Sequence, residues 1–480
     1  RENVQLAKMI ILSLSVLLYY LQFVSSLGVF YNSGFKYLTE RVLQIVANAD
    51  ISATKTRWIT QPINHFNESS DTWKMRYYEN LVYFRPKGPI YIFLGGEGEA
   101  DPGFLSTGVV HKMAQETNGA MFMTEHRYYG KSKPFDDLNV DNMKWLTSRQ
   151  ALADVANLIK SIKSAPLLMK SKVVIVGGSY SGNLAAWMRL LYSNLVDAAI
   201  ASSGPVLAKK DFFEYIEKVN EDYELYGTTE CLDTVRNMFM EYKKKLQSSD
   251  GIEELKNKFG ICPQSNLSII ENQWVFFTYL TDRFMENSQY GGAKKIEEHC
   301  SKLEAPMSSI FSNSLFWNKR SNCVDVSFNT MIEELKNESW AYSWFYQVCT
   351  EFGYFQTTSS DSQPFGQVLP LEYFIKSCQA LYGPDFDEDR VDKAIENTNK
   401  FYGGLKPNVT RVVFVNGDMD PWSTISVLED ISYETPAVVI HRVTHCADLF
   451  ADRHDASEEL KEASKHIKNL VKNWIGVGND

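Results

Sequence analysis

The chain has 480 residues, of which 44% are hydrophobic and 13% aromatic, enough for a large core in one big domain or in two or three smaller ones. Its formal net charge is −10, and the charges are interspersed without a basic stripe. This charge distribution argues against nucleic acid as a partner.

An apolar run near the N-terminus is typical of a secretory signal peptide. Lys8 precedes the run, which extends from Met9 to about Val24, and small residues follow at positions 25, 26 and 28. We therefore expect a signal peptide over residues 1–28 and a secreted or lysosomal protein. An uncleaved signal anchor is the alternative, but the run is short for a membrane span, which needs about 20 residues, so no stable span is expected. The chain also carries four N-glycosylation sequons, at Asn67, Asn266, Asn337 and Asn408.

Apolar runs typical of buried parallel strands recur along the rest of the chain. They lie at 89–98, 119–130, 172–178, 198–206, 411–422 and 437–445. Helical spacing appears at 148–163, and an amphipathic helix is expected at 456–475. Strands that alternate with helices predict a doubly wound, mostly parallel α/β sheet.

The pattern of apolar residues changes between residues 207 and 405, where strand-like runs give way to helical spacing with many aromatic residues. We interpret this segment as a mostly helical insertion that splits the core into residues 29–206 and 406–480. It holds six of the seven cysteines, at 231, 262, 300, 323, 349 and 378, and the seventh is Cys446. In an oxidising compartment six cysteines predict three disulfides, with fifteen connectivities open. No spacing matches the paired cysteines of a zinc site, and we expect neither a metal nor a cofactor.

The stretch "VIVGGSYSGNLAAWMRLLY" places a serine on a tight turn between a strand and a helix. An α/β-hydrolase holds its nucleophile on such a turn, usually as Gly-x-Ser-x-Gly. Gly177 and Ser179 fit this pattern, but Ser181 stands where the second glycine is expected. The sequence therefore predicts Ser179 as a candidate nucleophile.

A serine nucleophile needs a histidine base and an orienting carboxylate, which follow it in this fold in the order acid, then histidine. His445 is the candidate base because it comes at the end of the last predicted strand, where loops carry catalytic groups. His299 lies in the insertion, His441 within a predicted strand and His466 within the final helix. Asp420 follows the preceding core strand and is the candidate acid, with Asp418 as its competitor.

The oxyanion of an acyl-transfer reaction needs two backbone N–H groups. We expect one from Tyr180, directly after the nucleophile, and the other from the glycine turn at 95–98, with Gly96 as the candidate. The alternative is an α/β protein whose glycine turn only packs a helix on a strand.

These motifs together resemble the serine peptidases that include prolyl carboxypeptidase, dipeptidyl peptidase II and the thymus-specific serine peptidase. The matching pieces run in order from Gln61 to about Leu449, and the stretch at 351–357 most resembles the thymus-specific branch. They are "QPINHFN", "YIFLGGEG", "EHRYYGKSKP", "LTSRQALADVANLI", "GGSYSGNLAAWMRLLY", "ASSGPV", "WFYQVCTEFGYFQT", "VNGDMDPWS" and "THCADL". The family turn is usually Gly-Gly-Ser-Tyr-Gly-Gly, so Ser181 departs from it, and serine would be disfavoured there if the position required a positive φ.

The resemblance implies an α/β-hydrolase core with an inserted helical cap and a triad of Ser179, Asp420 and His445. It implies cleavage of peptide substrates next to proline, near a chain end. Aromatic side chains suit a proline ring, and the candidates are Trp344, Tyr346 and Trp422. By resemblance the disulfides are Cys349–Cys378, Cys231–Cys300 and Cys262–Cys323.

Which end of the peptide is trimmed depends on the charged group that meets it. Glu97, beside the oxyanion turn, would receive a terminal amine and favours release of dipeptides from the N-terminus, whereas a cationic side chain in the cap would favour a terminal carboxylate. Two other functions stay open, an esterase or lipase with the same triad and a catalytically silent binding protein. A homodimer stays open as well.

Overall fold

The computed structural model describes residues 50–67, 71–303, 323–453 and 455–477. The predicted signal peptide at 1–28 lies outside these residues. Within the described part of the chain, no helix combines the length and apolar character needed to cross a membrane.

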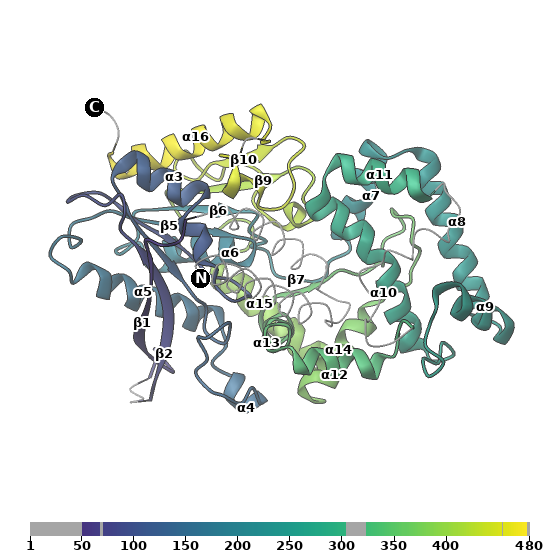
Figure 1. Cartoon of the computed structure of the whole chain (residues 1–480). Helices are drawn as coiled ribbons and strands as arrows, with labels where there is room; N and C mark the ends of the chain where they lie inside the picture. Colours follow the sequence, from purple (N-terminus) through teal and green to yellow (C-terminus); the bar gives the residue numbers. More distant parts are fainter. Residues whose placement is uncertain (1–49, 68–70, 304–322, 454, 478–480) are drawn as a thin grey trace, which may run out of the picture.

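A mostly parallel sheet forms the part of the molecule drawn on the left of Figure 1. Within the described residues it has eight strands in the order β1-β2-β4-β3-β5-β6-β9-β10. Strand β2 pairs antiparallel with both of its neighbours, and every other pairing in this sheet is parallel. The strands are β1 (Thr54–Pro62), β2 (Thr72–Asn80), β3 (Ile90–Phe93), β4 (Ala120–Thr124), β5 (Val173–Gly178), β6 (Ala198–Ser202), β9 (Val412–Gly417) and β10 (Ala437–Ile440).

Helices cover both faces of this sheet, because alternate side chains of each strand point to opposite sides. In β5, Val173 and Ile175 join the core cluster that holds the apolar residues of α5 (Ser148–Lys163) and α6 (Tyr180–Leu191). Val174 and Val176 join a second cluster with α3 (Gly108–Thr117) and α16 (Glu458–Ile475). The core is therefore doubly wound, as the alternation of strands and helices predicts. The short helices of the core are η2 (Pro102–Leu105), α4 (Val140–Met143), η6 (Pro421–Ile425) and η7 (Ala447–Phe450).

A mostly helical cap lies between β6 and β9 in the chain and packs beside the sheet (Figure 1). Its α-helices are α7 (Glu214–Tyr226), α8 (Thr229–Lys245), α9 (Ser249–Phe259), α10 (Ile270–Glu286), α11 (Ala293–Leu303), α12 (Phe328–Asn337), α13 (Ser339–Gln347), α14 (Leu371–Tyr382) and α15 (Glu388–Tyr402). Two π-helical turns, η3 (Asn287–Gly291) and η5 (Val348–Phe352), and a small parallel sheet of β7 (Lys209–Asp211) and β8 (Gly353–Phe355) complete it.

Three disulfides close loops inside the cap. They join Cys231 to Cys300, Cys262 to Cys323 and Cys349 to Cys378, which is the pairing that the family resemblance implies. Cys446 is a buried free thiol in the core. Each bridge restricts the unfolded chain, which stabilises the folded cap.

The last predicted strand is shorter than the sequence suggests. We expected it to reach His445, but β10 ends at Ile440, and Arg442 adopts a positive φ of 58°. The chain turns there because the side chain of Asp418 accepts the Arg442 N–H at 2.7 Å. His441 therefore lies just beyond the strand, and His445 lies in the loop that follows.

Candidate active site

The turn that carries Ser179 is a strained connection between β5 and α6. Ser179 has φ 57° and ψ −133°, a conformation that L-residues rarely adopt and that costs about 1–3 kcal/mol. The flanking glycines are required by close backbone contacts. A Cβ on Gly177 would lie 1.9 Å from the carbonyl oxygen of Ser181, and one on Gly182 would lie 2.6 Å from that of Ser202. The turn therefore holds Ser179 at the carboxyl edge of the parallel strands, where ligands bind in open α/β sheets.

Ser181 fits this turn without the conflict that the family pattern raised. It belongs to helix α6 and does not have a positive φ. Its hydroxyl donates to the carbonyl of Gly178 at 2.8 Å, and it accepts the Gly178 N–H at 2.9 Å. The serine therefore adds hydrogen bonds across the turn, at a position where the backbone does not need glycine.

Asp420 and His445 form a fully buried pair. His445 Nδ1 lies 2.7 Å from Asp420 Oδ2, and the two side chains are 1% and 0% exposed. Asp420 is fixed in turn by the N–H of Trp422, which it accepts at 3.0 Å. Burial lowers the pKa of His445, but Asp420 and the neighbouring Cys446 outweigh this effect and raise that pKa well above its usual range.

The competing acid, Asp418, is directed to a different histidine. Its carboxylate contacts His441 Nδ1 at 2.6 Å, and the side chains of His441 and Asp418 are 70% and 33% exposed. The structure thus separates two Asp–His pairs that lie close together in sequence, one buried at the end of the strands and one on the surface.

The loop that carries His445 lies against the turn that carries Ser179. A Cβ on Gly178 would be 3.0 Å from the thiol sulfur of Cys446, the residue after His445. With Nδ1 bound to Asp420, His445 Nε2 is the ring nitrogen left to accept a proton, and it makes no hydrogen bond to any residue that the structure describes. The buried histidine thus belongs to a loop that packs against the turn of the strained serine.

The two candidate oxyanion donors lie on either side of the serine turn. Tyr180 is the first residue of α6. The first N–H groups of a helix have no carbonyl partner within that helix, and the Tyr180 N–H is one of them. On the other side, the N–H of Gly95 donates to Thr124 Oγ1 at 3.1 Å. Gly96 comes next and approaches Ser181, because a Cβ there would lie 3.6 Å from the Ser181 Cβ. Gly96 is thus the residue of this loop that borders the serine turn.

Glu97 faces the same site. Burial raises the pKa of the Glu97 carboxyl, an effect that its own backbone and the nearby His445 oppose. Glu97 in turn contributes to the raised pKa of Tyr129 and of Tyr290. Glu97 is thus a half-buried carboxyl within electrostatic range of His445.

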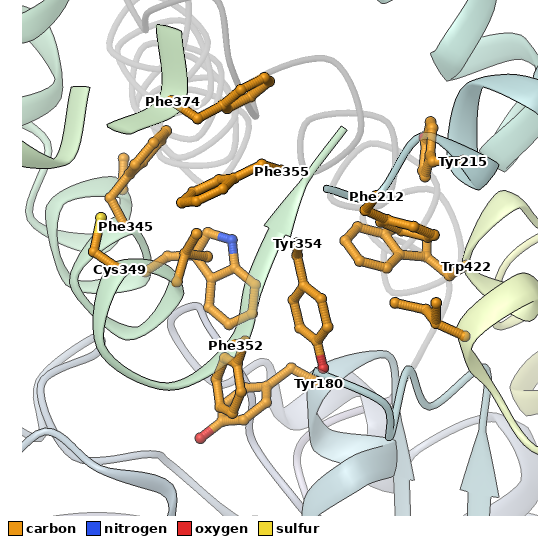
Figure 2. Close-up of a cluster of buried hydrophobic side chains, with 14 of the residues drawn as sticks. Tyr180, Phe212, Tyr215, Phe345, Cys349, Phe352, Tyr354, Phe355, Phe374 and Trp422 are labelled. Carbon is orange, nitrogen blue, oxygen red and sulfur yellow. The ribbon is translucent and has the colours of Figure 1, made fainter. Parts of the chain in front are cut away.

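Aromatic side chains from the core and the cap form one buried cluster (Figure 2). The Trp422 ring lies 6.4 Å from that of His445 and 5.4 Å from that of Tyr354, measured between centroids. Trp344 contacts the Tyr180 ring at 5.4 Å, so it borders the residue after the candidate nucleophile. Tyr346 is placed elsewhere, because its ring packs on Tyr382 and Phe386 inside the cap.

The cap contacts the histidine loop directly, through residues that the sequence did not single out. The carbonyl of Gln289, in the π-helical turn η3, accepts the His445 N–H at 2.9 Å. The ring of Tyr290 meets the His445 ring edge-on, with centroids 5.8 Å apart. No local sequence pattern marks this turn, because its role depends on the packing of a segment more than 150 residues away from His445.

A buried hydrogen-bond network joins the cap to the residue after Ser179. Gln347 of α13 accepts from the Tyr129 hydroxyl at 2.7 Å and donates to the Tyr180 hydroxyl at 2.9 Å. His126 contacts the same Tyr180 hydroxyl at 3.0 Å. Burial lowers the pKa of His126 to about 4, although its backbone contact to Arg127 opposes this. His126 therefore acts as a neutral structural partner.

Comparisons with known proteins bear on the family of the chain. Residues 61–467 match the sequence profile described as serine carboxypeptidase S28. Among relatives, K12H4.7 of Caenorhabditis elegans is 34% identical over 446 residues, covering 87% of each chain. The thymus-specific serine protease of Mus musculus is 30% identical over 449 residues, covering 88% of this chain and 87% of the relative. The lysosomal Pro-X carboxypeptidase of Mus musculus is 29% identical over 451 residues, covering 87% and 88%. The solved esterase of Pyrobaculum calidifontis covers 92% of both chains with 10% identity and a TM-score of 0.40.

Proposed function

We propose that this chain, which belongs to the serine carboxypeptidase S28 family and is thus a serine peptidase, is a proline-directed dipeptidyl-peptidase that uses a triad of Ser179, Asp420 and His445. The observation that carries the proposal is the buried pair of Asp420 and His445. The loop that holds His445 packs against the strained turn that holds Ser179. An exposed or unpaired histidine would not provide an oriented base.

In the proposed mechanism Ser179 Oγ attacks the carbonyl carbon of the scissile bond, and His445 Nε2 takes the hydroxyl proton. Asp420 holds the ring through Nδ1 and stabilises the imidazolium that forms. The N–H groups of Tyr180 and Gly96 bind the oxyanion. His445 then returns the proton to the leaving amine, and a water molecule hydrolyses the acyl-enzyme by the same route in reverse.

The first test separates a triad from a silent binding protein. Ser179→Ala is expected to abolish peptide hydrolysis and labelling by a fluorophosphonate probe, since loss of the nucleophile typically costs about 10⁶-fold in rate. Ser181→Ala is the matched control, because Ser181 is two residues away on the same turn and is used in hydrogen bonds to Gly178. Activity that survives Ser179→Ala but not Ser181→Ala would refute the assignment.

The cap supports an exopeptidase. The Gln289 carbonyl and the Tyr290 ring contact His445 from the cap side, so the base is covered on that side. A long chain threading past the triad would have to displace these contacts, whereas a chain end would not. The aromatic groups Trp422 and Trp344 are the proposed proline contacts.

The proposed N-terminal specificity rests on Glu97, and it has its own test. A protonated amine would pair with the Glu97 carboxylate, so a free Xaa-Pro peptide should be cleaved much faster than its N-acetylated twin. Glu97→Gln should raise KM for the free peptide about tenfold or more and reduce the difference between the twins. Glu99→Gln is the control, because Glu99 is close in sequence but pairs with Arg76 at 2.7 Å. Equal cleavage of both twins by the native chain would refute the aminopeptidase assignment.

We further propose a secreted or lysosomal location. Support comes from the lysosomal relative, from three disulfides, and from the surface exposure of all four sequon residues, Asn67, Asn266, Asn337 and Asn408. Treatment of the expressed protein with an N-glycosidase, followed by peptide mapping, tests these glycan sites.

A further inference from the structure

Two consecutive serines at the carboxyl end of β6 contact the segments that carry all three members of the proposed triad. The carbonyl of Ser202 accepts the N–H of Ser179 at 2.9 Å, which fixes the backbone of the candidate nucleophile. The hydroxyl of the same residue donates to Asp448, which lies three residues after His445. Ser202 thus joins the nucleophile turn to the histidine loop.

Ser203 joins the histidine loop to the strand before the acid. Its hydroxyl accepts the N–H of Cys446 at 2.9 Å, and its own N–H donates to the carbonyl of Val415 in β9. Asp420 follows that strand after a short turn. The backbone of Ser203 has a positive φ of 46°, a strained conformation for a serine that directs the chain toward these partners.

Burial makes these contacts hard to replace. Ser202, Ser203 and Asp448 are 0%, 1% and 7% exposed, so water is largely excluded from them. Loss of the Ser203 hydroxyl would leave the Cys446 N–H without its acceptor. Loss of the Ser202 hydroxyl would remove the side-chain donor of the Asp448 carboxyl, which is otherwise bound only by its own backbone N–H. A buried polar group deprived of its partner favours a shift of the chain that carries it, here the loop that holds His445.

We infer that Ser202, Ser203 and Asp448 form a positioning unit that sets the His445 ring relative to Ser179 and Asp420. The inference rests on the proposed triad. None of the three side chains has a role in the proposed proton transfers, so they act through His445 and are positioning residues. The cap holds the His445 N–H through Gln289, and Ser203 holds the N–H of the next residue, Cys446, from the core side. The two contacts together fix the loop from opposite domains.

The experiment compares steady-state kinetics of Ser202→Ala, Ser203→Ala, Asp448→Asn and Asp448→Ala on an Xaa-Pro reporter peptide. Misplacement of a catalytic group by about 1 Å can cost about 10²-fold, so we expect kcat of the two serine variants to fall about 10- to 100-fold with KM within about threefold. Asp448→Asn keeps an oxygen that accepts from Ser202 and should retain more activity than Asp448→Ala. Ser377→Ala is the control, because it removes an equally buried hydroxyl bond, to the Tyr373 carbonyl in cap helix α14, and should leave kcat unchanged.

A pH profile distinguishes positioning from a general loss of stability. Because Asp420 raises the pKa of His445, a looser Asp420–His445 contact lowers that pKa. The acid limb of kcat/KM should therefore move to lower pH in Ser203→Ala and stay in place in Ser377→Ala. If a serine variant does not fold, the Asp448 pair provides the same comparison without altering β6.

Serine variants that keep kcat within about threefold of the native chain, or an acid limb that does not move, would overturn the inference. Ser179→Ala, measured in parallel, tests the proposed triad separately from the positioning unit. If it abolishes hydrolysis while the serine variants are fully active, the triad stands and the positioning unit fails. If it retains activity, the triad itself fails and the inference falls with it.

Discussion

Asp418 and Asp420 are two residues apart, yet their carboxylates contact different histidines. Substitution of the two aspartates should therefore have very different effects on catalysis. Asp420→Asn should lower kcat by about 10⁴-fold, because the amide favours the wrong imidazole tautomer. Asp418→Asn should change kcat less than about threefold, since its partner His441 is on the surface. Steady-state kinetics on the Xaa-Pro reporter measure both, and equal losses would contradict the assignment.

The sequence could indicate those candidate site residues that come directly after a predicted strand. Ser179, Asp420 and His445 follow strands, so the order of elements indicates their common edge. Residues that meet only through packing had no such signal. Tyr346 has the right chemistry for a proline pocket, but α13 directs it to Tyr382 and Phe386. Gln289 contacts His445 through its backbone carbonyl, which any residue type could supply.

The turn between β5 and α6 carries the prediction at the scale of elements. Gly177→Ala would place a methyl group 1.9 Å from the Ser181 carbonyl, so the first turn of α6 must move away from the strand. We expect a loss of kcat of at least about 10²-fold, in line with misplaced catalytic groups, or a failure to fold. Gly260→Ala is the control. It has a φ of 59° but no neighbour within 4 Å, so it should cost only about 1–2 kcal/mol of stability and leave kcat unchanged. A Gly177→Ala chain with native kcat would show that the turn tolerates a side chain.

The inner parallel strands could be predicted because they are continuous apolar runs buried on both faces. The first two strands, β1 and β2, could not be identified in this way. Most of β1 is exposed at the sheet edge, and β2 mixes buried and exposed residues, so neither forms a continuous apolar run. The predicted end of the last strand was also wrong. The chain turns at Arg442 because of a contact with Asp418, which lies in the loop after β9, so the local sequence does not show the turn.

At the scale of the whole molecule, several family motifs converge on one buried ion pair. The fully buried Arg127 of "EHRYYG" donates to both carboxylate oxygens of Asp154, which belongs to α5. His65 of "QPINHFN" contacts the same carboxylate at 2.7 Å, and the Ile63 carbonyl accepts from Arg127. These motifs are therefore recognisable in the sequence although they lie outside the proposed triad. Their contacts link the end of β1, the segment after β4 and helix α5 to one another.

Buried acids in the cap make stability depend on pH in a direction that can be predicted. Burial raises the pKa of Asp222 to about 8, of Glu334 to about 7 and of Glu351 to about 7, from 3.8 for the aspartate and 4.5 for the glutamates. The folded chain thus holds protons that the unfolded chain has already released above pH 4.5. A carboxyl with a raised pKa stabilises the fold at low pH, and this contribution is lost as the pH rises through the folded value.

Two buried histidines, His126 and His299, act in the opposite sense, but only in more acidic solution. Burial lowers the pKa of His126 to about 4 and of His299 to about 3, so both favour unfolding as the pH falls below 6.5. Between pH 6.5 and 8 the acids dominate, and we expect the free energy of unfolding to fall by on the order of 2 kcal/mol over this range. The thermal midpoint should therefore be a few degrees lower at pH 8 than at pH 6.5. Asp222→Asn should flatten this slope, whereas Asp392→Asn, an exposed control that pairs with Lys210, should preserve it. A midpoint that rises from pH 6.5 to 8 would contradict the assignment of these carboxyls as protonated in the folded chain.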